Sequence, residues 1–317
     1  MKDVPQATGP AWLVQQAAGE LAQGRRVCIA TVVSSGPGAP APGSAWLVRE
    51  DGPAQFCPAA RRAGGPDGAE PASLAAAVVQ QARHLLERAR TRPPGRAAGP
   101  RERMAHLVWP QPQPASGPDG GPQAAGRTRV FLELLEPPPR LLVVGAGQDA
   151  PPLCRLAVEA GFEVRVADPR PAFAVPSRFP QAREVRLCEP GALPEEWFRG
   201  DCYAVVMNHH FLRDVAALRQ LVEQRVPYIG VLGPRARTER LVARVEQELG
   251  RALDAPELGS IYSPVGVDLG GESPGAIALS IVAEVLAFRY GRPVPHLRDR
   301  RGPLHPERLQ PPAASAG

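Results

Sequence analysis

The sequence predicts an α/β protein with a Rossmann-like parallel sheet in its C-terminal domain and a smaller mixed α/β domain at its N-terminus. After residue 140, short apolar runs alternate with segments of helical period, which is typical of a parallel sheet with crossover helices. Residues 92–129 are dominated by proline, glycine and alanine and separate the two halves. A chain of 317 residues with 44% hydrophobic residues is long enough for two cores.

The N-terminal domain is expected to cover residues 1–91. Amphipathic patterning predicts its helices, and apolar β-branched runs bounded by glycine and proline predict its strands. In chain order, these elements are a helix at 11–23, strands at 27–33 and 45–49, and a helix at 73–90.

The middle of the chain reads as a connection between domains. Residues 92–129 are predicted to be a linker or long loop with one short strand at 105–109, because so few apolar side chains cannot form a core. Residues 130–139 follow as a strand and a stiff triproline connector. The polar, proline-rich segment 292–317 is predicted to be a disordered tail.

The strongest fold signal lies in residues 141–168, within a Rossmann-like domain expected at 140–291. An apolar strand meets a glycine turn, a helix follows, and a second strand closes on Asp168. Gly145 permits a tight turn, Gly147 allows a phosphate to approach the backbone, and Asp168 stands where an acid accepts from ribose hydroxyls. Asp149 argues against a phosphate site, because it is expected to cap the helix and repel an anion.

The α/β alternation continues to residue 291. Strands are predicted at 183–187, 203–207 and 228–232, a helical turn at 194–198, and helices at 212–224, 235–249 and 273–290.

Polar side chains follow three of these segments, where the carboxyl ends of parallel strands form a ligand-binding crevice. The candidate residues are His209 and Asp214, Gly233 and Arg235, and Gly266 and Asp268. A histidine there suits proton transfer or phosphate binding, and an arginine suits an anion. Each group also has a plainer interpretation as a helix cap or a solvated helix start.

Several linked motifs then resemble one family. The stretches MNHHFLRDVAAL, PYIGVLGPRARTERL and SPVGVDLGGESPGAIALSIVAEVLAFRYG follow GAG and ADPRPAFAVPSRFPQA in this order. Together they resemble the C-terminal domain of the xanthine dehydrogenase accessory factor family, XdhC/CoxI-like. The stretch CIATVVSSGPGAPAPGSAWLVREDG resembles the first domain of that family.

The resemblance implies a cytoplasmic maturation factor that binds molybdenum cofactor (molybdopterin) and inserts it into a molybdenum hydroxylase such as xanthine or CO dehydrogenase. The implied partners are the apoenzyme, a cysteine desulfurase and a second copy of the chain in a homodimer. The family's cofactor-binding motif positions are Gly145, Gly147, Asp168, His209, Asp214, Gly233, Arg235, Gly266 and Asp268. The resemblance implies a non-catalytic accessory protein and names no catalytic residue.

The chain departs from the family at its N-terminal cysteine motifs. A Ser-Gly-Gly-Cys-Val-Glu motif is expected after Arg-Glu-Asp-Gly, but Cys57 stands several residues too early. A Gly-Cys-Gly-Gly motif is also missing, and Gln148 replaces the histidine that commonly follows the Gly-Ala-Gly turn. Two alternatives therefore stay open: a degenerate member that acts as a scaffold, and an NAD(P)-dependent oxidoreductase built on the Rossmann unit.

Composition argues against other classes. The formal charge is +5, but Lys2 is the sole lysine, aromatic residues make up 5%, and the arginines are scattered among acids, so nucleic-acid binding is not expected. No apolar run reaches 18 residues and the start lacks a signal-like stretch, so a cytoplasmic protein without membrane segments is expected. The cysteines form no C-x-x-C pair and are expected to be reduced, mostly buried thiols and no metal site.

Overall fold

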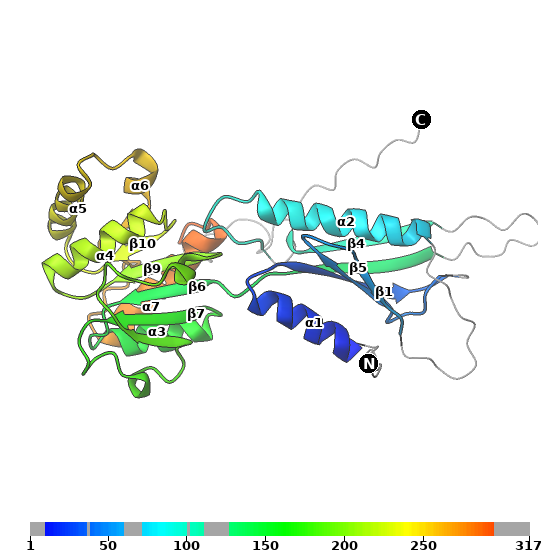
Figure 1. Ribbon diagram of the computed structural model, residues 1–317, viewed down its shortest axis with the longest axis horizontal. Coiled ribbons are helices and arrows are strands. Elements are labelled where there is room, and N and C mark those ends of the chain that lie inside the picture. The colour runs from blue at the N-terminus through cyan, green and yellow to red at the C-terminus, as the bar shows by residue number, and fades with distance from the viewer. Residues whose placement is uncertain (1–9, 37–38, 60–71, 100–101, 111–126, 295–317) are drawn as a thin grey trace, which may run out of the picture.

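The chain folds into two sheets, each with its own helices, which lie side by side along the long axis of the molecule (Figure 1). The computed structural model describes residues 10–36, 39–59, 72–99, 102–110 and 127–294. The fold is the expected one: a parallel sheet in the C-terminal half and an antiparallel sheet before it.

The N-terminal sheet has five antiparallel strands in the order β3-β2-β1-β5-β4. Its strands are β1 (Val27–Ser34), β2 (Ala45–Arg49), β3 (Gln55–Cys57), β4 (Met104–Pro110) and β5 (Arg127–Leu135). Strand β5 alternates between exposed and buried positions, because its buried side chains share a core with α2, whereas the helix on the other face of the sheet lies over β1 and β2.

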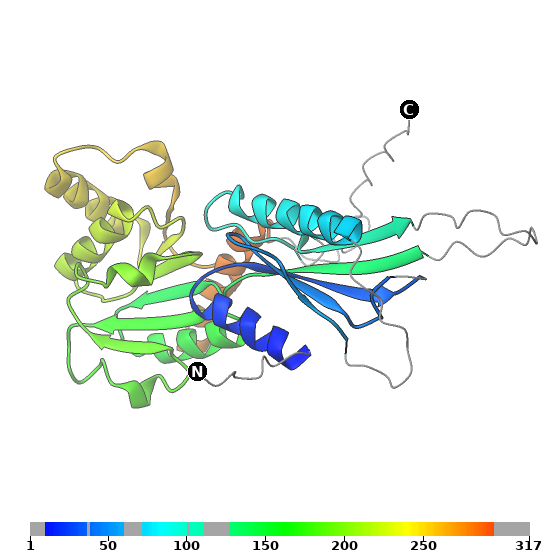
Figure 2. The same cartoon turned by 45° about the vertical axis from the view of Figure 1, so that its right-hand side comes forward.

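Two helices cover opposite faces of this sheet (Figure 2). Helix α2 (Ala72–Arg90) places Leu74, Val78 and Leu85 against the inward side chains of β1, β2 and β5. Helix α1 (Pro10–Ala22) packs Leu13 and Ala17 against the other face, over β1 and β2. The small domain is therefore a three-layer unit with two cores.

The C-terminal sheet has six parallel strands in the order β11-β10-β9-β6-β7-β8, which is the Rossmann order with a reversal between β6 and β9. Its strands are β6 (Arg140–Val144), β7 (Glu163–Asp168), β8 (Glu184–Leu187), β9 (Cys202–Val206), β10 (Ile229–Val231) and β11 (Ile261–Tyr262). The central strand β9 is buried along its whole length, as expected for a parallel strand covered on both faces.

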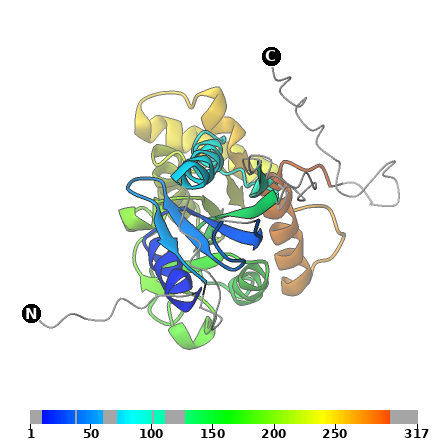
Figure 3. The ribbon, with the colours of Figure 1, turned by 90° about the vertical axis from the view of Figure 1, so that its right-hand side faces the viewer.

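Helices cover both faces of this sheet. Helices α3 (Ala150–Glu159) and α7 (Pro274–Tyr290) pack together on one face (Figure 3), and helices α4 (Phe211–Glu223) and α5 (Arg235–Leu249) pack together on the other. A short helix, α6 (Ala255–Gly259), precedes β11, and the 3-10 helices η2 (Pro176–Arg178) and η3 (Glu195–Phe198) flank β8. In sheets of this kind, ligands generally bind beside the carboxyl ends of the strands.

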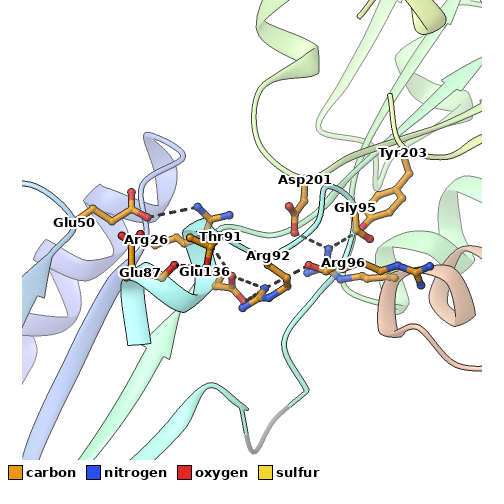
Figure 4. A network of polar contacts seen from close by, with 11 residues as sticks. Arg26, Glu50, Glu87, Thr91, Arg92, Gly95, Arg96, Glu136, Asp201 and Tyr203 are labelled. Atoms are coloured by element: carbon orange, nitrogen blue, oxygen red, sulfur yellow. Dashed lines mark hydrogen bonds and ion pairs between the residues drawn. The ribbon is translucent and has the colours of Figure 1, made fainter. Parts of the chain in front are cut away.

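Residues 91–98 hold the two domains together and are called the interdomain clasp below (Figure 4). The Tyr203 hydroxyl donates to the Gly95 carbonyl at 2.7 Å, and the Ala97 N–H donates to the Arg289 carbonyl at 2.8 Å. Arg96 donates to the Phe288 carbonyl and lies over the Phe288 ring. The clasp therefore binds the Rossmann domain at the edge opposite the carboxyl ends of its strands.

The structure differs from the sequence expectations in the middle of the chain. Residues 92–129 do not separate the domains as a plain linker, because β4 and the start of β5 pair there as part of the N-terminal sheet. The short elements β3, α6 and β11 were also not predicted. The expected disordered tail, residues 292–317, falls outside the described residues except for its first three. No described helix has the length and apolar character needed to cross a membrane.

Candidate functional site

The glycine turn after β6 lies at the point where the strand order reverses. Gly145 has φ +113°, and a Cβ added there would stand 2.6 Å from the carbonyl carbon of Met207 and 2.7 Å from the Asn208 nitrogen. Only glycine tolerates both this backbone conformation and this contact. The turn is therefore pressed against the exit of β9, at the switch point where open α/β sheets generally bind their ligands.

Asp168 holds the turn from the end of β7. Its carboxylate is fully buried and accepts four hydrogen bonds: from the Ala146 N–H at 2.7 Å, and from the N–H, Nε and Nη2 of Arg170 at 2.7–2.8 Å. Burial alone would raise the pKa of Asp168, but these donors outweigh burial and hold the pKa below its ordinary value. Its acceptor capacity is thus used within the protein.

Arg178 binds the same turn and was not singled out from the sequence. Its guanidinium donates to the carbonyls of Ala146 at 2.7 Å, Phe173 at 3.1 Å and Gly147 at 3.2 Å. It also lies 5.1 Å from the centroid of the Phe173 ring. Among the described residues, no carboxylate is paired with Arg178, so its positive charge stays beside the glycine turn.

His209 lies over Gly147 and faces Asp149. A Cβ at Gly147 would be 3.9 Å from His209 Cδ2, and His209 Nε2 lies 3.7 Å from Asp149 Oδ2. His209 has φ +55° and an exposed ring. Asp149 makes no side-chain capping hydrogen bond to α3, contrary to the sequence expectation, and lies toward the histidine instead. The neighbouring His210 takes the plainer role, because it caps α4 by accepting from the Arg213 N–H.

A buried polar cluster lies beneath His209. Asp214 is 1% exposed and accepts from the backbone N–H and Nδ2 of Asn208 at 3.1 and 3.0 Å, and from Arg237 Nη2 at 2.5 Å. Two buried atoms in this cluster have no hydrogen-bond partner: the acceptor Asn208 Oδ1 and the donor Arg237 Nη1. Buried polar atoms are rarely left unpaired, so this pair calls for an explanation.

The remaining motif residues lie elsewhere. Arg235 is 81% exposed at the start of α5 and pairs with Glu239 one turn along, which matches the plainer interpretation of a solvated helix start. Gly233, with φ +124°, forms the turn that leads into α5 and faces Arg237. Asp268 is exposed and accepts only from the Gly270 N–H among its described contacts.

Gly266 packs on α7. A Cβ there would collide with Ser280, and the Gly266 N–H donates to Glu284 at 3.0 Å. The same Glu284 accepts from the Tyr228 hydroxyl. The structure thus brings together Gly145, Gly147, His209 and Asp214, places Asp168 beneath the turn, and leaves Arg235 and Asp268 facing solvent.

The cysteines provide no thiolate at this site. All five are free, and Cys28, Cys57, Cys154 and Cys202 are buried. Burial raises the pKa of the Cys28 and Cys202 thiols to about 12 and that of Cys154 to about 11, so these three are protonated at neutral pH. Within the described ranges, no group of three or more His, Cys, Asp or Glu side chains is arranged to hold a metal ion.

Comparison with known proteins identifies the C-terminal half. The family model of the XdhC Rossmann domain matches residues 141–285. Residues 141–285, a little under half of the chain, are therefore similar to an XdhC Rossmann domain. The glycine turn, Asp168 and the Asn208–Asp214–Arg237 cluster all lie inside it.

Two curated relatives align with this chain over only part of their own length. A probable xanthine dehydrogenase subunit of Bacillus subtilis (strain 168) is 38% identical over 164 residues, which are 51% of this chain and 46% of that protein. The "Uncharacterized protein YqeB" of Escherichia coli (strain K12) is 30% identical over 175 residues, 55% of this chain and 31% of that protein. This chain therefore matches less than half of either relative.

One similar crystal structure covers nearly the whole chain. It is described as a xanthine dehydrogenase from Bacillus halodurans, is 22% identical, and aligns with 94% of this chain and 98% of its own at a TM-score of 0.44.

Proposed function

We propose that this protein is a maturation factor for a molybdenum hydroxylase, such as xanthine or CO dehydrogenase, that binds the molybdenum cofactor and delivers it to the apoenzyme. The XdhC Rossmann domain and the relative named for xanthine dehydrogenase support this proposal. The crevice between β6 and β9 is the binding site in this account, with the apoenzyme and a cysteine desulfurase as partners in the transfer.

The residues at the crevice fit a ligand of this chemistry. A pterin ring offers hydrogen-bond donors and acceptors along one edge, and Asn208 Oδ1 and Arg237 Nη1 are an acceptor and a donor without partners. A phosphate needs positive charge and a close approach to the backbone. Arg178 brings its guanidinium to the turn, and Gly147 has no side chain in the way, since the nearest atom to an added Cβ is His209 Cδ2 at 3.9 Å. The bound cofactor supplies molybdenum redox chemistry to the client enzyme, and this chain's residues hold and shield it.

The observation that carries the proposal is the unpaired state of the two buried atoms. Leaving a buried polar atom unpaired costs about 1–3 kcal/mol. An ordered water or a ligand at the switch point of the sheet would satisfy them, and in this proposal the occupant is the ligand. Asn208 and Arg237 are therefore the residues we assign to cofactor recognition, together with His209 at the rim.

The same geometry disfavours the oxidoreductase alternative. In dinucleotide-binding enzymes, the acid at the end of the second strand accepts from the ribose hydroxyls. Here the Asp168 carboxylate already accepts four hydrogen bonds, three of them from Arg170. A nicotinamide dinucleotide would have to displace Arg170 to use this acid, so NAD(P) is the weaker candidate.

Anaerobic titration with molybdenum cofactor, followed by pterin fluorescence after oxidation, tests the site. Arg237→Gln should weaken cofactor binding at least tenfold, because it removes the unpaired donor and the cation. Arg235→Gln is the matched control on the same helix, and it should bind as the unaltered protein does, because Arg235 faces solvent. Equal affinities of the two variants would contradict cofactor binding at the crevice.

A further inference from the structure

A cavity of about 220 Å³ lies where the two domains meet, away from the crevice. The N-terminal part contributes Ala97, Ala98 and Arg103, and the connector contributes Glu136 and the three prolines that follow. The Rossmann domain contributes residues 160–162 after α3 and the end of α7. Both domains therefore line one space.

Two arginines line this cavity, one from each domain. Arg289 is buried, and its Nη1 donates to Asp201 Oδ2 at 3.0 Å and to the Tyr203 hydroxyl at 2.9 Å. These contacts hold the guanidinium in one orientation. Arg103 immediately precedes β4, and its backbone carbonyl accepts from the Leu134 N–H. No hydrogen bond or ion pair of the Arg103 side chain to any described residue is present.

The acids at the junction are already paired. Glu136 is the one acid among the lining residues, and its carboxylate lies 3.3 Å from Arg26 and 3.1 Å from Arg92 (Figure 4). Asp201 is bound to Arg289. Arg103 thus brings a positive charge that no described carboxylate balances.

The rest of the lining is apolar or aromatic. It includes Phe162, Leu286 and Tyr290, and the prolines of the connector have no N–H to donate. A ligand here would meet both guanidinium groups and apolar side chains. Guanidinium groups bind planar or tetrahedral oxyanions through paired hydrogen bonds.

We propose that the interdomain cavity binds a small organic oxyanion, a carboxylate or a phosphate monoester, between Arg103 of the N-terminal domain and Arg289 of the Rossmann domain. The apolar part of the ligand lies against Phe162 and Leu286. Because the ligand contacts both domains, its binding stabilises their arrangement and raises the free energy of unfolding of the whole chain.

Calorimetric titration of the full-length protein with phenyl phosphate and with benzoate tests this site and distinguishes the two oxyanion classes. We expect binding of at least one of them, weakened at least tenfold in Arg103→Gln. Arg155→Gln, which removes an exposed arginine from α3, is the control and should bind as the unaltered protein does.

Arg237→Gln separates this cavity from the crevice and should leave the affinity for both probes unchanged. Loss of binding in Arg237→Gln with retention in Arg103→Gln would assign the oxyanion to the crevice and overturn the proposal. Failure of both probes to bind the unaltered protein would overturn it as well.

Discussion

At the scale of single residues, the sequence predicted the glycine turn after β6 but not the arginine side chain that binds it. Gly145 and Gly147 were predictable, because a glycine pattern between strand and helix has a steric cause. Arg178 was not, because its three carbonyl partners meet it only in the folded chain.

The sequence also did not show which of Arg235 and Arg237 contacts Asp214. Two residues along a helix turn a side chain by about 200°, so one arginine reaches Asp214 and the other faces solvent. The sequence does not say which of the two faces the crevice.

Gly145→Ala tests the contact between the turn and β9. The new methyl group would collide with the backbone at Met207, and positive φ adds strain, so we expect a loss of about 2–4 kcal/mol in the free energy of unfolding. Gly161→Ala is the control, because Gly161 has φ +90° but open space around it. It should lose about 1 kcal/mol by the strain alone. Equal losses in urea denaturation would contradict a tight turn.

At the scale of elements, long periodic segments were predictable and short ones were not. Helices α2, α4 and α5 lie within one residue of their predicted bounds, because their apolar positions repeat with helical period. Helix α6 was not predicted, because its five residues are too few to show a helical repeat of apolar positions. Its capping box, in which Asp254 and Glu257 accept each other's backbone N–H, was the signal that could have revealed it.

Glu257 makes the stability of this region depend on pH. Arg251 donates to both its oxygens at 2.8 Å, and this pair, with the Asp254 N–H, lowers the pKa of Glu257 to about 2. A lowered pKa means that the contribution is full above the ordinary value of 4.5 and is lost as pH falls toward 2.

Glu257→Gln should therefore destabilise the protein at pH 6 and have a much smaller effect near pH 2.5. Chemical denaturation at several pH values measures this difference. Glu239→Gln, which alters an exposed pair on α5, is the control. A deficit of Glu257→Gln that stayed constant from pH 6 to pH 2.5 would contradict the assignment.

At the scale of the whole molecule, the sequence predicted two domains but not how they are joined. Pairing of β4 with β5 draws part of the expected linker into the N-terminal sheet, and the segment before it docks on the Rossmann domain as the clasp. Both depend on contacts between residues far apart in the sequence, such as Gly95 with Tyr203. No local pattern encodes such contacts.

Tyr203→Phe tests the clasp. The hydroxyl donates to Gly95 and accepts from Arg289, so its removal leaves the buried Gly95 carbonyl without this donor and leaves Arg289 with Asp201 alone. This loss should cost about 1–3 kcal/mol. Limited proteolysis should cleave the clasp faster in this variant than in the unaltered protein. Tyr290→Phe, at an exposed position, should behave as the unaltered protein does. Unchanged cleavage in Tyr203→Phe would mean that the domains are held together by other contacts.

Cofactor binding itself is tested by anaerobic mixing of the purified protein with molybdenum cofactor, followed by gel filtration. Oxidised pterin is then assayed by fluorescence in the protein peak. The account predicts about one pterin per chain in that peak, because one crevice between β6 and β9 binds one cofactor. A protein peak without pterin, with apoenzyme still captured in a pull-down, would contradict cofactor binding and favour the scaffold alternative.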